Sequence, residues 1–116
     1  MVTMRTLAAA AVLVAGVALA SCAQSEGTTA QAPARTHTVI MEGMAFRPSV
    51  ITVAAGDSII WVNKDLVPHA ATSETAGFDS QVIQANGSWR TRLDRAGEFD
   101  YICSFHPTMT AKVKVR

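Results

Sequence analysis

The sequence carries almost no excess of charge of either sign. It has ten Lys or Arg and nine Asp or Glu, a formal net charge of +1 with neutral histidines, and residues 36–116 contain eight of each sign. Without a basic stripe that releases counterions from phosphates, we expect no binding to nucleic acid. Helical periodicity is also missing, because no segment keeps apolar residues at helical spacing for three turns. The folded part is therefore expected to consist of strands.

Long apolar runs are limited to one near the start of the chain. Residues 7–20 contain no polar side chain and follow a single early charge at Arg5. This run is too short for a comfortable membrane span. We therefore predict a secretory signal peptide over residues 1–21.

The end of that run carries a short motif. Leu19-Ala20-Ser21-Cys22 resembles the bacterial lipobox, which implies cleavage before Cys22 and acylation of this cysteine. The alternative is an ordinary signal, cleaved near Ala20 or Ala23, that leaves Cys22 free or removes it.

The next segment is poor in apolar residues. Residues 23–35, AQSEGTTAQAPAR, have no periodicity that would bury a face, so residues 22–35 are predicted to be a lipidated cysteine followed by a flexible tether with a reach of at most about 45 Å. This organisation predicts a membrane-anchored lipoprotein in the bacterial periplasm. An aspartate after the lipidated cysteine is associated with retention in the inner membrane, and the alanine at position 23 favours the outer membrane.

Residues 36–116 are predicted to form one folded domain of short strands. Strict alternation of apolar and polar residues over positions 111–116 indicates a strand with one buried face. Turn residues such as Asn86-Gly87 separate the runs. Several short strands at regular spacing favour an antiparallel sandwich. The expected strands are residues 37–41, 50–53, 58–62, 88–93, 98–103 and 110–116.

Cysteine is scarce, and only Cys103 lies within the predicted domain. A disulfide with Cys22 is conceivable in an oxidising compartment, but Cys22 belongs to the lipobox and lies at the far end of the tether. A metal is the more natural explanation for a single cysteine here, since small domains are often stabilised by a metal.

The segment around Cys103 carries the chemistry. Cys103, His106 and Met109 lie at three-residue intervals, and a strand end followed by a tight loop would turn a thiolate, an imidazole and a thioether toward one point. His69, in a loop that leaves the strand near position 62, would supply a second imidazole. Two imidazoles, one thiolate and a weak axial thioether are the ligands of a blue copper site.

With these residues in place, the domain resembles a cupredoxin and is most similar to the amicyanin and plastocyanin group. The resemblance covers residues 38–116 and includes the following motifs: Phe46-Arg47-Pro48, Ile51-Thr52-Val53, Gly56-Asp57, Trp61-Val62-Asn63, Pro68-His69, Phe78-Asp79-Ser80, Ala96-Gly97-Glu98-Phe99, Tyr101-Ile102-Cys103, His106-Pro107 and Met109.

The resemblance implies an all-β, Greek-key β-sandwich of seven to eight strands that binds one copper through His69, Cys103, His106 and Met109. It also implies a docking surface around His106 that includes Pro68, Pro107 and Phe105. Cytochrome c or a quinoprotein dehydrogenase would suit such a protein as a redox partner, and we expect a monomer.

Two positions depart from the family pattern. Ala70 follows His69 where an asparagine is usual, which puts the rigidity and the potential of the site in question. Ala111 stands where a glycine often follows the axial methionine.

The remaining candidates are expected to be structural. His37 has no partner within the ligand pattern and is predicted to be a solvated side chain, and Met41 and Met44 are predicted to serve packing. The scattered carboxylates of Glu42, Asp57, Asp65, Glu74 and Asp94 form no paired constellation in the sequence.

The predicted function is single-electron transfer by copper cycling between Cu(I) and Cu(II), without catalysis. Three alternatives stay open. The first is copper storage or delivery with incidental redox activity. The second is a cysteine nucleophile paired with His106, which lacks an orienting group and a second redox cysteine. The third is a cupredoxin-like module that no longer binds metal.

Overall fold

The computed structural model describes residues 9–13, 15–16 and 32–116. Residues 9–13 have no regular secondary structure, and Val12 and Leu13 are exposed. Cys22 and most of the expected signal peptide and tether lie outside the described residues. Within the part of the chain that is described, we find no helix with the length and apolarity to cross a membrane.

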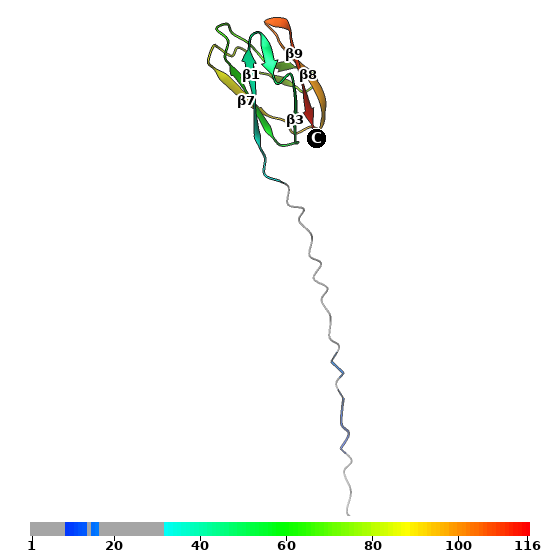
Figure 1. The fold of residues 1–116 in the computed structure, drawn as a ribbon. Coiled ribbons are helices and arrows are strands. Elements are labelled where there is room, and N and C mark those ends of the chain that lie inside the picture. Colours follow the sequence, from blue (N-terminus) through cyan, green and yellow to red (C-terminus); the bar gives the residue numbers. More distant parts are fainter. Residues whose placement is uncertain (1–8, 14, 17–31) are drawn as a thin grey trace, which may run out of the picture. The chain divides into compact units, whose positions relative to one another are not determined.

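The described residues 32–116 fall within one compact unit that contains nine strands in two sheets (Figure 1). The first sheet has the order β2-β1-β4-β7 and the second has the order β3-β9-β8-β5-β6. The strands are β1 (Thr36–Glu42), β2 (Ala45–Arg47), β3 (Val50–Val53), β4 (Ser58–Asn63), β5 (Thr72–Ser73), β6 (Phe78–Asp79), β7 (Ser88–Arg92), β8 (Gly97–Cys103) and β9 (His106–Val115).

This architecture confirms the all-β sandwich, but the expectation of purely antiparallel sheets is wrong. β1 pairs with β4 in parallel, from Thr36↔Ser58 to Met41↔Asn63, and β3 pairs with β9 in parallel, from Val50↔Lys112 to Val53↔Val115. Alternation determines which face of a strand is buried and leaves the direction of its neighbour open. The extra strands relative to the expected seven to eight include β5 and β6, which have two residues each.

The core lies between the two sheets and is centred on Trp61. Its indole ring packs against Phe78, Trp89 and Tyr101 with centroid separations of 5.2, 5.5 and 5.7 Å. Each of these rings is contributed by a different strand, so the cluster joins both sheets. Trp61, Phe78 and Tyr101 are buried in this core, and Trp89 is partly buried against it.

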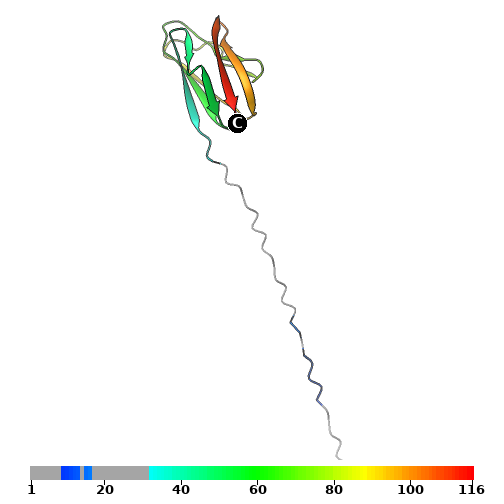
Figure 2. The ribbon, with the colours of Figure 1, turned by 45° about the vertical axis from the view of Figure 1, so that its right-hand side comes forward.

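The hairpin of β8 and β9 (Figure 2) turns at the end of the domain that carries the expected ligands Cys103 and His106. This end is called the site end. Residues 106–109 were expected in a loop, but β9 begins at His106 and Cys103 pairs directly with it. Only Ser104 and Phe105 form the turn, and the register shifts between Ile102 and Cys103. The register of the strands therefore holds two of the expected ligands opposite each other.

The other end of the domain is where β1 begins and β9 ends (Figure 1). His37 is only partly exposed here and pairs with Asp57, contrary to the prediction of a solvated side chain. Its Nε2 lies 2.8 Å from Oδ2 of Asp57, a carboxylate that also accepts hydrogen bonds from the backbone N–H groups of Arg35 and Ala54. The sequence did not reveal this contact because His37 and Asp57 are twenty residues apart.

Candidate metal centre

Three of the four expected ligands converge at the site end of the domain. Sγ of Cys103 lies 3.7 Å from Nδ1 of His69 and 3.7 Å from Nδ1 of His106. The ligating atoms of these three residues lie within 4.8 Å of one another. His69 and Cys103 are fully buried, while His106 is partly exposed.

Met109 lies in β9, three residues beyond His106, and its side chain is only 3% exposed. A buried methionine within this hairpin is consistent with the role of thioether donor predicted for it. Met41 is fully buried in the core, as expected, whereas Met44 lies in an exposed turn and does not pack inside.

The separations within the cluster fit a bound metal. Two bonds of about 2.0–2.3 Å that meet at a trigonal angle separate the donor atoms by about 3.7 Å. A thiolate and two imidazoles suit copper better than a hard cation such as Mg²⁺ or Ca²⁺. The residues present therefore fit one copper ion, which His69, Cys103 and His106 would hold with Met109 as a further thioether donor.

His69 is positioned by the segment that follows β4. Its backbone forms a two-way bridge with Ile83, with N···O distances of 3.1 and 2.7 Å. Asn63, at the end of β4, is fully buried and donates from Nδ2 to the carbonyls of Val67 and Ile83, while its Oδ1 accepts the N–H of Asp65. One side chain thus holds both the loop before His69 and the segment paired with it.

Asp65 is a site residue that the sequence did not reveal. Its Oδ2 lies 2.7 Å from Nε2 of His69, on the side of the ring away from Cys103. Its two oxygens also accept the N–H groups of Gly43 and Met44. These hydrogen bonds, Met44 first and then His69, lower the pKa of Asp65, so the carboxylate stays charged. The four-residue spacing of Asp65 and His69 was the only available signal.

The carboxylate determines which imidazole nitrogen faces the centre. A charged acceptor at Nε2 favours the tautomer with the proton on that nitrogen, which leaves Nδ1 free as a ligand. The same contact fixes the orientation of the His69 ring.

The alanine after His69 preserves one contact to the thiolate. The backbone N–H of Ala70 lies 3.4 Å from Sγ of Cys103, and Ala70 itself is fully buried. A hydrogen bond from the main chain does not depend on the side chain at this position. The backbone N–H of Ala70 is therefore available to the sulfur of Cys103 even though the usual asparagine is absent.

Comparison with known proteins gives a match between residues 9–115 and the model of the cupredoxin-like domain family. The chain belongs to this family. It is similar to amicyanin-alpha of Methylorubrum extorquens, with 32% identity over 97% of this chain and 99% of that protein. It is also similar to the chloroplastic plastocyanin of Tetradesmus obliquus, with 28% identity over 88% of this chain and 73% of that protein.

A solved structure extends this comparison to the fold. The reduced state of an amicyanin variant superposes with a TM-score of 0.64 and 26% identity, over 70% of this chain and 82% of that one. The predicted membership of the cupredoxin family is thus confirmed.

Proposed function

We propose that this protein carries single electrons between periplasmic redox partners through one type 1 copper bound by His69, Cys103, His106 and Met109. The observation that carries the proposal is the pair of 3.7 Å separations from the buried thiol of Cys103 to the two imidazoles. Family membership and the burial of Met109 support it.

Copper, when bound, supplies a one-electron change between its cuprous and cupric states. The protein's own residues keep the donor atoms in nearly the same place in both states. Cys103 and His106 are held by strand pairing, and His69 is held by its bridge to Ile83 and by Asp65. A rigid donor set reduces the reorganisation that would slow transfer.

The donor set also favours an electron carrier over an enzyme. Four protein ligands would close the metal, and an open position is what a catalytic metal site requires. Asp65, the carboxylate in contact with the cluster, lies behind His69 and not next to Cys103. It orients a ligand and is not positioned as a base for Cys103.

The surface beside His106 is suited to brief encounters. Exposed apolar side chains lie on both sides of His106, at Phe105 in the turn and Pro107 in β9, and in the loop before His69, at Leu66, Val67 and Pro68. Small interfaces of this kind are typical of redox partners. We infer that a cytochrome c or a quinoprotein dehydrogenase docks here with a monomer of this protein.

The location proposed for this activity follows from the start of the sequence. Residues 1–21 would direct export, and acylation of Cys22 would anchor the protein in the periplasm, in the outer membrane by the alanine at position 23. Residues 22–35 would then act as the tether of the domain formed by residues 36–116.

The test is a visible absorption spectrum of residues 32–116 during titration with Cu(II), followed by reduction with ascorbate. We expect an intense blue band at one copper per chain that bleaches and returns on reoxidation. Cys103→Ser should abolish the band, because the colour arises from the bond between sulfur and copper.

Met44→Leu is the matched control, since Met44 is an exposed methionine near the site that we do not assign as a ligand. This variant should keep the band. A colourless complex, or binding of Cu(I) without reversible cycling, would contradict electron transfer and favour copper delivery.

A further inference from the structure

The end of the domain opposite the metal centre is rich in arginine. Five arginines lie there, at the start of β1, along β7, before β8 and at the end of β9, namely Arg35, Arg90, Arg92, Arg95 and Arg116. Its acidic side chains are Asp57, Asp94 and Glu98, and Glu98 pairs with Lys114. The rest of residues 32–116 has five Asp or Glu against three Lys or Arg. The domain is therefore electrically polar, with its positive end opposite the site.

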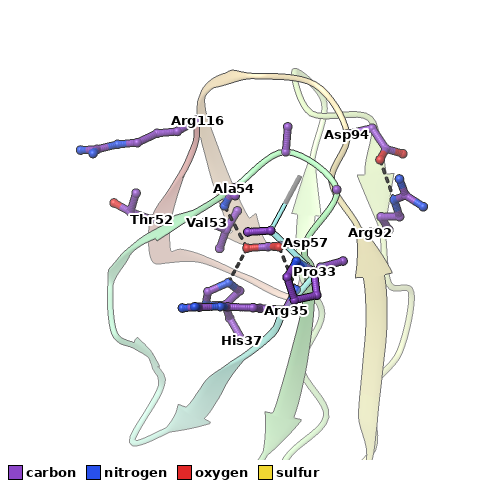
Figure 3. Close-up of a pocket in the computed structure, with 14 residues that line it drawn as sticks. Pro33, Arg35, His37, Thr52, Val53, Ala54, Asp57, Arg92, Asp94 and Arg116 are labelled. Atoms are coloured by element: carbon purple, nitrogen blue, oxygen red, sulfur yellow. Dashed lines mark hydrogen bonds and ion pairs between the residues drawn. The ribbon is translucent and has the colours of Figure 1, made fainter. Parts of the chain in front are cut away.

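Three of these arginines surround one cavity of about 780 Å³ (Figure 3). Arg35, Arg92 and Arg116 line it together with His37 and Asp57. The carboxylate of Asp57 lies at its centre and is already occupied by His37 and by two backbone N–H groups. The lining therefore carries three guanidinium groups against the two carboxylates of Asp57 and Asp94, and it remains net positive.

The arginine side chains differ in whether they have a contact partner among the described residues. Arg92 pairs with Asp94 at 2.6 Å, and Arg95 lies over the ring of Phe99. The side chains of Arg35 and Arg116 form no ion pair or hydrogen bond with any residue in the described ranges, although the backbones of both are held in the fold. Two guanidinium groups are thus available to an anionic partner.

We propose that this arginine-rich end docks on the anionic phosphate headgroups of a lipid surface. Charge complementarity identifies the chemistry of the partner, because guanidinium groups bind phosphate oxygens in pairs. The position of this end favours lipid headgroups as the source of the phosphate. The chain enters β1 here from residues 22–35, whose predicted acylation at Cys22 would bring headgroups within about 45 Å.

The proposal rests on the predicted anchoring and adds an orientation to it. Docking of this end turns the metal centre away from the bilayer, so that the apolar surface around His106 faces soluble partners. The docking itself needs neither copper nor acylation and can be measured without them.

The experiment is cosedimentation of residues 23–116 with vesicles of phosphatidylcholine, with and without phosphatidylglycerol. These residues include the whole compact unit with its own core. We expect binding only to vesicles that contain phosphatidylglycerol, and this binding should weaken as salt is raised. Removal of two arginines near an anionic surface should weaken binding more than tenfold, at roughly fivefold for each.

The test variant is Arg35→Gln with Arg116→Gln, and the matched control is Arg47→Gln with Lys64→Gln. Both pairs remove two positive charges, but Arg47 and Lys64 lie outside the arginine-rich end. The test variant should lose binding while the control keeps it. Unchanged melting of both variants shows that the fold is intact.

Three results would overturn the proposal. These are absence of binding to phosphatidylglycerol vesicles, an equal loss in both variants, and displacement by inorganic phosphate that exceeds displacement by chloride at equal ionic strength. The last result would identify the cavity as a site for free phosphate. None of these results depends on copper binding. The blue band therefore tests the proposal of electron transfer separately.

Discussion

Asp65 shows how one residue links the metal centre to the fold around it. It bonds to His69 and at the same time to the N–H groups of Gly43 and Met44, in the turn between β1 and β2. The two residues of that turn have positive φ angles, 63° and 58°. Met44 in this left-handed conformation is unusual for a long side chain. The carboxylate therefore stabilises an uncommon turn and orients the ring of His69, a proposed ligand.

We expect Asp65→Asn to raise the reduction potential of the copper protein by tens of millivolts. Loss of the negative charge beside His69 destabilises the cupric state more than the cuprous state. For a one-electron couple, about 59 mV corresponds to a tenfold change in the ratio of the two states. A redox titration followed by the blue band measures this potential.

Glu42→Gln serves as the control for Asp65→Asn. It removes the same charge from an exposed side chain at the end of β1, without contact to a ligand. Its potential should stay close to that of the unmodified protein. An equal rise in both variants would show that net charge, and not the contact with His69, sets the potential.

At the scale of elements, the predictable features are those that local patterns encode. Short runs of apolar residues predicted β4, β7 and β8, alternation predicted most of β9, and the spacing of Cys103 and His106 predicted that their side chains meet. The start of β9 was missed because Pro107 favoured a loop at that position. Proline is tolerated early in a strand, where its missing N–H leaves few pairs unmade.

The contacts that hold His69 in place could not be predicted from the sequence. Asn63 appeared only as part of a family motif, and its three hydrogen bonds depend on how the chain folds back between residues 64 and 83. The pairing of Asp65 with His69 has the same origin. Contacts made by loops leave no periodic pattern, whereas strands do.

Asn63→Ala should lower the free energy of unfolding by about 3 kcal/mol. The variant leaves two carbonyls and one N–H without their partner in a buried region, at about 1 kcal/mol or more for each lost bond. Denaturant unfolding of the metal-free protein measures the change. The blue band of the copper protein should also broaden, since His69 loses part of its support.

Gln84→Ala is the control for Asn63→Ala, because Gln84 lies beside Ile83 but its side chain is exposed. It should change stability by less than about 0.5 kcal/mol. A similarly small effect of Asn63→Ala would mean that the loop before His69 is held by other contacts.

For the whole molecule, Asp57 predicts how stability responds to acid. The N–H of Arg35, the side chain of His37 and the N–H of Ala54 lower the pKa of Asp57 from 3.8 to about 2. The unfolded chain therefore takes up a proton on this residue at a higher pH than the folded chain does. The stabilisation is complete above about pH 4 and is lost as the pH falls toward 2.

Asp57→Asn should remove this part of the acid sensitivity. The variant is expected to be less stable at neutral pH, and its stability should fall less steeply than that of the unmodified protein between about pH 4 and pH 2. Chemical unfolding of the metal-free proteins at a series of pH values gives both slopes. Equal slopes would show that other carboxyls account for acid unfolding.

The parallel pairing of β1 with β4 also has a mechanical consequence. Six residue pairs, from Thr36↔Ser58 to Met41↔Asn63, join the two strands side by side. A force that pulls the chain at Thr36 along the strand loads the hydrogen bonds of this ladder together in shear, instead of opening them one after another. The domain therefore resists unravelling from the point at which its own leading segment would pull on it.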